Sequence, residues 1–127
     1  MSETEQGWVD QALYDLETAQ AMLASGRYLY VLFCCQQAAE KALKAVIVRR
    51  TGELPPRVHN LMRLAETAKI QLTPDVQRFL GELSSYYIQS RYPEEIKTVG
   101  SAVSRELAAS IHAKTEQTVQ WVLSMLK

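Results

Sequence analysis

The sequence predicts an all-α fold, an up-and-down bundle of four long helices with one additional short helix. Apolar residues recur at three- and four-residue spacings along most of the 127-residue chain, as they do on the buried faces of helices. The five Gly and four Pro lie in a few short stretches, which is typical of long helices joined by few turns. The sequence carries no alternating strand pattern of useful length, which favours helices throughout.

The first two helices are expected over about residues 4–25 and 28–50. Ser2 and Glu5 have the spacing of a capping box at the start of the first, and Gly26 follows its end. The second is apolar around most of its circumference, which predicts more than one packing neighbour. A polar stripe interrupts this apolar surface, and its members are Gln36, Gln37, Glu40, Lys41 and Lys44.

The remaining helices are marked by their ends. Gly52 and the two prolines that follow it end the second helix, and a shorter third helix comes next. Thr73, followed directly by proline, predicts the start of the fourth. Residues 90–95 are expected to form a helix exit and loop, because Pro93 disfavours helical geometry at the residue before it. Ser101 is expected to cap the last helix, which continues to the end of the chain.

Length and composition limit the classes of protein. The length fits one domain spanning residues 1–127, and the 14 basic and 14 acidic residues exclude a uniformly basic nucleic-acid binder. Cys34 and Cys35 are adjacent, so we interpret them as buried thiols in a reducing cytosol. The acidic start lacks the features of a signal peptide, and charged residues interrupt the apolar second helix. We therefore expect a cytoplasmic protein with no membrane span.

The neutral total hides a separation of charge along the chain. Residues 1–26 contain five acidic and no basic residues, whereas residues 27–63 contain seven basic and two acidic residues. One interpretation is that the first two helices pair and their charges complement each other. Another is that one end of the bundle is basic and suited to phosphate. The residues that would form this basic end are Arg49, Arg50, Arg57 and Arg63.

The sequence contains neither a metal-ligand spacing nor a glycine-rich phosphate loop, so we expect no metal and no cofactor. His59, before the third helix, is either a helix-start residue with backbone partners or part of a site. Arg105 and His112 are seven residues apart on the last helix, so they project from one side, roughly 10 Å apart along the axis. With Glu116 they form either a solvated stripe or a functional pair.

The stretch Arg91-Tyr92-Pro93 is open to two interpretations. A guanidinium and a phenol held by a proline could grip a phosphate and stack on a base. Alternatively, Tyr86, Tyr87 and Tyr92 cap one end of the bundle. The residue types alone do not favour either interpretation.

Three motifs together resemble the HEPN domain family. They are the run Gln-Gln-Ala-Ala-Glu-Lys-Ala-Leu-Lys-Ala at 36–45, His59-Asn60-Leu61, and Ser90-Arg91-Tyr92-Pro93. The resemblance implies a helical bundle that usually dimerises, often acts beside a minimal nucleotidyltransferase in toxin-antitoxin-like pairs, and binds nucleotides. The nucleotide or phosphate site is then expected at Lys41, Lys44, His59, Arg91 and Tyr92.

Many members of the family are instead metal-independent dimeric ribonucleases that use Arg, four to six residues, then His. No His follows Arg91 at that spacing. Arg105 and His112 have six residues between them, but Glu106 and Glu116 would repel a phosphate, so this pair is only a weak catalytic candidate.

Three functions therefore stand as hypotheses. The leading one is a nucleotide-binding or partner-binding module that acts with a nucleotidyltransferase. The second is a ribonuclease toxin that uses Arg105 and His112. The third is a structural subunit in which Lys41 pairs with Glu40 inside the bundle. We also expect a homodimer, because the start of the second helix is too apolar for one neighbour.

Overall fold

The computed structural model describes residues 1–87 and 92–127, and in these ranges the chain forms helices and no strand. This confirms the all-α helical bundle. The elements are α1 (Glu3–Ala24), α2 (Tyr28–Thr51), α3 (Leu61–Thr67), α4 (Pro74–Ser84), α5 (Pro93–Ser101), α6 (Arg105–Leu123) and a terminal 3-10 turn (Ser124–Leu126).

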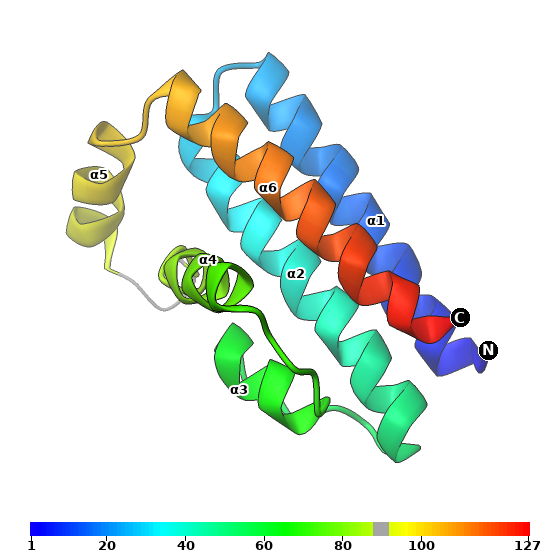
Figure 1. Cartoon of the computed structure of the whole chain (residues 1–127). Coiled ribbons are helices and arrows are strands. Elements are labelled where there is room, and N and C mark those ends of the chain that lie inside the picture. The colour runs from blue at the N-terminus through cyan, green and yellow to red at the C-terminus, as the bar shows by residue number, and fades with distance from the viewer. Residues whose placement is uncertain (88–91) are drawn as a thin grey trace.

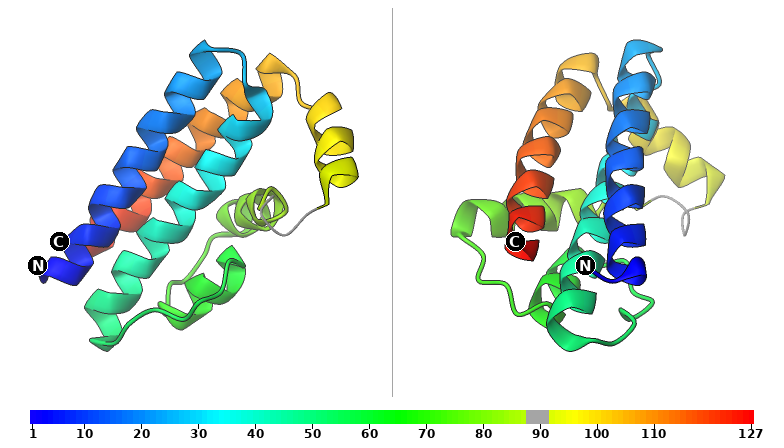
Figure 2. Two further views of the ribbon diagram at one scale, coloured as in Figure 1. Left: turned by 180° about the vertical axis from the view of Figure 1, so that it is seen from behind. Right: turned by 90° about the vertical axis from the view of Figure 1, so that its right-hand side faces the viewer.

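The three longest helices, α1, α2 and α6, lie side by side and form what we call the long-helix body (Figure 1). Helix α1 runs antiparallel to α2, as expected of sequential helices joined by a short turn. Helix α6 runs in the same direction as α2, because the segment between them returns the chain to the end where α2 begins (Figure 1). The two termini consequently lie at the same end of the body (Figure 2).

Helix α2 is the centre of the core. Of its 24 residues, 13 are buried, and it packs against α1 and α6 on one side and against α3 and α4 on another. This agrees with an apolar surface that covers most of the helix. The largest fully buried apolar side chains on α2 are Leu32, Leu43 and Ile47.

Most helix ends follow the local signals in the sequence. The Ser2 hydroxyl accepts a hydrogen bond from the backbone N–H of Glu5 at 3.1 Å, and Thr73 caps α4 in the same way. Gly52 adopts the left-handed conformation after α2, with φ of 72°, where a side chain would be strained. Ser2 and Thr73 thus each satisfy one backbone N–H at a helix start, and the Gly52 N–H donates to the Val48 carbonyl at the end of α2.

The expectation that residues 90–95 form a loop is wrong for the part of this stretch that the structure describes. Pro93 is the first residue of α5, where proline is favoured because its missing N–H needs no partner. Ser101 is consequently the last residue of α5, and Ser104 caps α6 by accepting from the Leu107 N–H at 3.0 Å.

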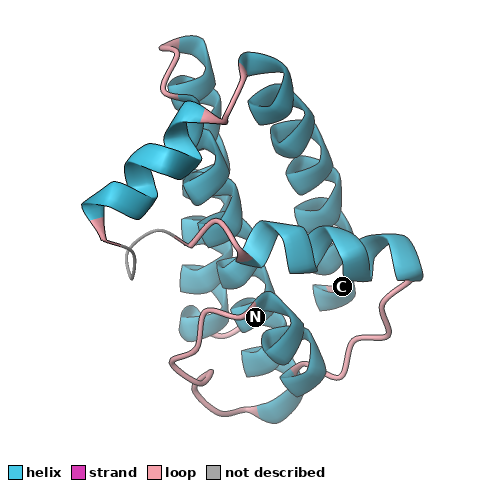
Figure 3. Ribbon diagram, turned by 90° about the vertical axis from the view of Figure 1, so that its left-hand side faces the viewer, coloured by secondary structure: helices cyan, strands magenta, loops and turns pink. Residues whose placement is uncertain are grey.

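The three shorter helices, α3, α4 and α5, form what we call the short-helix side. Helix α4 runs across the direction of the long helices (Figure 3). Its end is tied to the start of α3, since the Ser84 hydroxyl accepts from the Leu61 N–H at 2.7 Å. Helix α5 stands away from the body and has no buried residue. Within the short-helix side, α3 and α4 contribute buried residues to the core, and α5 is the loosely packed helix.

Candidate functional site

The polar stripe of α2 forms a buried cluster around Glu40. The Glu40 side chain is only 5% exposed, and its Oε2 lies 2.9 Å from Nζ of Lys44, one helical turn further on. Its Oε1 accepts a hydrogen bond from Nε2 of Gln36 at 3.1 Å. A buried carboxylate is stable when it is paired and hydrogen-bonded, and Glu40 has both kinds of partner.

His59 connects this cluster to the surface. Its Nδ1 lies 3.0 Å and 3.2 Å from the two oxygens of Glu40. An ionised carboxylate can only accept, so Nδ1 carries a hydrogen and Nε2 is the ring atom left for other partners. The carbonyl of His59 also accepts from Gln36 Nε2 at 3.2 Å. The His59 side chain is 46% exposed, so Glu40 of α2 holds one edge of the ring while part of the ring is accessible to solvent.

Tyr87, just after α4, lies against the other side of the imidazole. The rings of Tyr87 and His59 are stacked, with centroids 4.0 Å apart and planes 15° apart. The Tyr87 hydroxyl lies 3.1 Å from His59 Nε2. The ring of Phe33 on α2 also lies near the phenol ring, with centroids 6.0 Å apart. Burial, together with the negative charge of Glu40, raises the pKa of Tyr87, so the hydroxyl keeps its hydrogen. Residues from α2, from the segment before α3 and from the end of α4 thus meet at one place.

The two lysines expected in the site both have protein partners. Lys41 forms an ion pair of 2.7 Å with Asp15 of α1, whereas Lys44 pairs with Glu40 and lies 5.3 Å from the ring centroid of Trp8. The pairing of Lys41 with Glu40, expected for a purely structural subunit, is therefore wrong. The expectation that charges complement each other between the first two helices is confirmed.

Two of the four arginines of the proposed basic end have hydrogen-bond partners within the protein. Arg49 donates from Nε to Glu5 at 3.0 Å, and this hydrogen bond raises the pKa of Arg49. Arg50 donates to the carbonyls of Ala68 and Lys69, both at 3.0 Å, and so holds the end of α3 against α2. Arg57 and Arg63 are exposed.

The remaining candidates are spread over the chain. Arg91 lies outside the described residues. Tyr92 precedes α5, and with 73% of its surface exposed it does not cap the bundle. Arg105 is exposed and His112 half-buried on α6, and neither side chain forms a hydrogen bond or ion pair with a residue that the structure describes. Of the sequence candidates that the structure describes, His59 and Lys44 meet at the cluster.

Sequence reasoning assigned no role at the site to Tyr87. The contact between Tyr87 and His59 spans 28 positions, and no local spacing announces such a contact. Gln36 was recognised as part of the stripe, but its hydrogen bond to the His59 carbonyl spans 23 positions and is likewise a tertiary feature.

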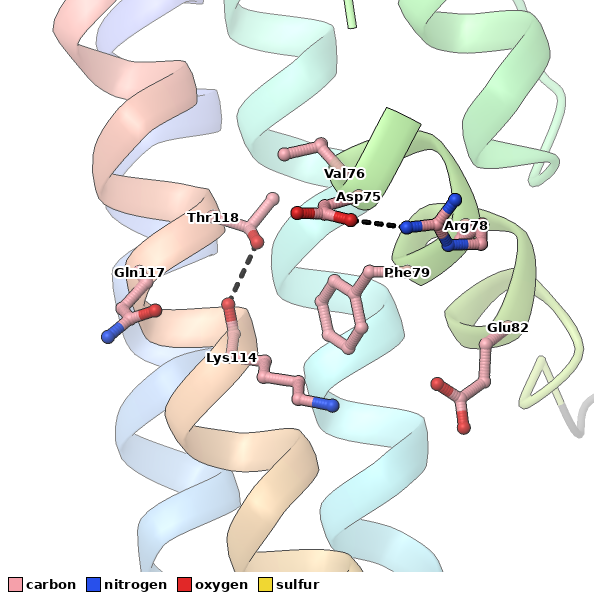
Figure 4. Close-up of a pocket in the computed structure, with 8 residues that line it drawn as sticks. All are labelled: Asp75, Val76, Arg78, Phe79, Glu82, Lys114, Gln117 and Thr118. Atoms are coloured by element: carbon pink, nitrogen blue, oxygen red, sulfur yellow. Dashed lines mark hydrogen bonds and ion pairs between the residues drawn. The ribbon is translucent and has the colours of Figure 1, made fainter. Parts of the chain in front are cut away.

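A separate cleft of about 440 Å³ lies between α4 and α6 (Figure 4). Phe79 lies at its centre, with the charged side chains of Glu82 and Lys114 nearby (Figure 4). None of the residues expected in a nucleotide site lines it. The lining residues are Asp75, Val76, Arg78, Phe79, Glu82, Lys114, Gln117 and Thr118.

Metal-binding clusters and membrane-spanning helices are both absent from the described ranges. Within residues 1–87 and 92–127, no group of three or more His, Cys, Asp or Glu side chains is arranged to hold a metal ion. No helix in the same ranges is sufficiently long and apolar to cross a membrane.

The chain is similar in structure to two solved proteins. TT1696 from Thermus thermophilus is 26% identical, with a TM-score of 0.82 over 95% of this chain and 97% of that one. ST0689, described as an archaeal HEPN homologue, is 23% identical, with a TM-score of 0.77 over the full length of both chains, which shows a shared fold. No curated protein matches the sequence. The HEPN domain model matches residues 5–125, nearly the whole chain, and the protein therefore belongs to the HEPN family.

Proposed function

We propose that this HEPN module binds the phosphate of a nucleotide at His59 and acts with a nucleotidyltransferase partner. The observation that carries the proposal is a half-exposed imidazole held at Nδ1 by a buried carboxylate. When such an imidazole is protonated, its outer nitrogen becomes a charged donor at a fixed position, and charge-assisted hydrogen bonds of this kind are strong.

Of the two lysines expected in the site, Lys44 supports it from the interior of the bundle. Lys44 lies against Glu40, so the buried pair is neutral as a whole. A proton on His59 therefore gives the cluster a net positive charge, which favours a phosphate. Lys41 lies on the side of α2 that faces α1, with Asp15 as its partner, so its contribution to binding is expected to be small. Arg91 and Tyr92 remain predictions from the sequence as further contacts to the phosphate and the base.

The two histidines of the chain provide a matched test. We expect wild-type protein to bind ATP in isothermal titration calorimetry at pH 6.5. The His59→Gln variant, which keeps hydrogen-bonding capacity without charge, should bind about tenfold more weakly. The His112→Gln variant should bind like wild type, because His112 lies on α6, away from the cluster. Circular dichroism of both variants checks that they fold.

Two results would contradict this proposal. One is no heat of binding for wild-type protein with any nucleoside triphosphate at millimolar concentration. The other is loss of binding in His112→Gln with unchanged binding in His59→Gln, because that pattern would place the site on α6.

The partner and the oligomeric state are tested separately. We expect a small nucleotidyltransferase to be encoded next to this chain and to copurify with it when the two are expressed together. We also expect a homodimer, since Tyr30 at the start of α2 remains 48% exposed and offers apolar surface to a second copy. A species of 14 kDa in sedimentation at micromolar concentration would contradict the dimer.

A ribonuclease activity at Arg105 and His112 is the second candidate. It is supported by the unbroken helix α6, which contains both residues and so projects them from one side. The test is incubation of wild type and His112→Ala with total RNA in the absence of metal. Cleavage by wild type that is lost in the variant supports the ribonuclease, and equal absence of cleavage excludes it.

A further inference from the structure

The structure provides a second hydrogen-bonding group beside His59 Nε2. We propose that Tyr87 is a phosphate-binding residue, and that one ligand phosphate bridges the His59 Nε2 hydrogen and the Tyr87 hydroxyl. This inference rests on the proposed function of His59 and adds to that site a residue that neither the sequence motifs nor the family comparison assigned.

The Tyr87 hydroxyl lies outside the plane of the imidazole ring. The two rings are stacked with only 15° between their planes, so the hydroxyl lies to one side of the imidazole plane rather than in it. An imidazole nitrogen accepts best in the plane of its ring. The contact of 3.1 Å between the hydroxyl and Nε2 is therefore a poor hydrogen bond, and it does not use the in-plane direction from Nε2, in which a ligand would bind.

The protonated form of the His59 imidazole is the one expected to bind phosphate. When His59 is protonated, Nε2 carries a hydrogen and can no longer accept one from Tyr87. The hydroxyl hydrogen must then point away from Nε2. Burial raises the pKa of Tyr87, so the hydroxyl still has this hydrogen to donate. Two donors 3.1 Å apart result, and this separation suits two oxygens of one phosphate.

Contacts within the protein hold both donors, His59 Nε2 and the Tyr87 hydroxyl, in position. His59 is held through its ring by Glu40 and through its carbonyl by Gln36. The Tyr87 ring contacts both the imidazole of His59 and the ring of Phe33. The end of α4, three residues before Tyr87, is fixed to the start of α3 by the hydrogen bond between Leu61 N–H and the Ser84 hydroxyl. Both donors are thus positioned before any ligand arrives, which reduces the loss of conformational freedom on binding.

The test removes the hydroxyl and keeps the ring. The Tyr87→Phe variant retains the stack on His59, so its thermal stability should be close to that of wild type. Its affinity for ATP should fall about tenfold, because a hydrogen bond to a charged group is lost. Tyr86→Phe is the matched control, since the Tyr86 hydroxyl lies 3.4 Å from Glu82 and away from His59. Its affinity for ATP should equal that of wild type.

Proton NMR locates the bound phosphate. The chain has two histidines, so the imidazole signals of His59 and His112 can be assigned from the His59→Gln variant. We expect ATP and inorganic tripolyphosphate to shift the signals of His59 and leave those of His112 unchanged. Adenosine, which has no phosphate, should shift neither. A response of His59 to adenosine would overturn the assignment of a phosphate to these two donors.

The remaining outcomes separate this inference from the proposed function. If His59→Gln loses affinity while Tyr87→Phe binds ATP like wild type or more tightly, His59 binds phosphate without Tyr87, and only the present inference is overturned. If wild type, Tyr86→Phe and Tyr87→Phe all fail to bind ATP and tripolyphosphate, and the His59 signals do not move, both proposals are overturned.

Discussion

The long-helix body and the short-helix side place the same kinds of side chain in different surroundings. In the body, charged groups such as Glu40 and Lys44 are buried and paired with each other. On the short-helix side, α5 has no buried residue and charged groups such as Arg78 and Asp75 are exposed. The candidate site lies where the two meet, with Glu40 from the body holding His59 at the edge of α3. The buried Glu40 thus fixes the position of the partly exposed His59 imidazole.

The largest expected effect comes from breaking the buried ion pair. Glu40→Ala leaves the Lys44 ammonium buried without its counter-ion, which should lower the free energy of unfolding by about 3–5 kcal/mol. The exposed ion pair on α4 is the comparison, and Asp75→Ala should lower it by less than about 1 kcal/mol. Urea denaturation measures both variants.

A double variant tests the reason for this loss. Glu40→Ala combined with Lys44→Met removes both charges and should recover at least half of the lost stability. If the double variant is no more stable than Glu40→Ala, the unpaired lysine is not the cause of the destabilisation.

Two isoleucines compare apolar packing in the two regions. Ile47 of α2 is 1% exposed, and Ile47→Ala should lower the free energy of unfolding by about 2–5 kcal/mol. Ile96 of α5 is only half-buried, so Ile96→Ala should lower it by about 1 kcal/mol. Equal losses in thermal or urea denaturation would mean that α5 packs as tightly as the body does.

The loss of stability at alkaline pH tests how deeply the Cys35 thiol is buried in the long-helix body. Burial raises the pKa of Cys35 from 9.0 to about 12. Below pH 9 the thiol is protonated in both folded and unfolded chains, so its contribution to stability is complete. Between pH 9 and 12 only the unfolded chain loses the proton, and stability falls, by about 2 kcal/mol at pH 10.5.

The two adjacent cysteines allow a matched comparison of this effect. The fall in unfolding free energy from pH 8 to pH 10.5 should be smaller in Cys35→Ala than in wild type. Burial also raises the pKa of Cys34, but this thiol is only half-buried, so Cys34→Ala should reduce the fall less than Cys35→Ala does. The same fall in Cys35→Ala as in wild type would show that other groups cause the alkaline loss.

The smallest expected effect distinguishes the two serines near the start of α6. Ser104→Ala removes the hydroxyl that caps the helix and should lower the free energy of unfolding by about 1 kcal/mol. Ser101→Ala, at the exposed end of α5, should change it by less than about 0.5 kcal/mol. A larger loss of unfolding free energy in Ser101→Ala than in Ser104→Ala would support Ser101 as the residue that caps the last helix.

Local signals allowed much of the fold to be predicted. The bounds of α1 and α2 and the start of α4 followed from apolar spacing, from the caps at Ser2 and Thr73, and from Gly52, whereas α4 ends at Ser84, before the exit expected at residues 90–95. Helix α5 was missed because proline is found both just after helices and at their first position. Pro93 was interpreted in the first sense and occupies the second.

The sequence by itself determined the helical bundle, the polar stripe on α2 and the family motifs, because these depend on residue types and spacings within one segment. The Glu40–Lys44 ion pair follows from i,i+4 spacing within α2, whereas the partner of Lys41 was decided only by the tertiary structure. Lys44 lies on the same face of α2 as Glu40, whereas Lys41 lies on a neighbouring face opposite Asp15. The meeting of His59 with Tyr87 was likewise decided by the packing of α3 and α4, because contacts between distant segments leave no periodicity in the sequence.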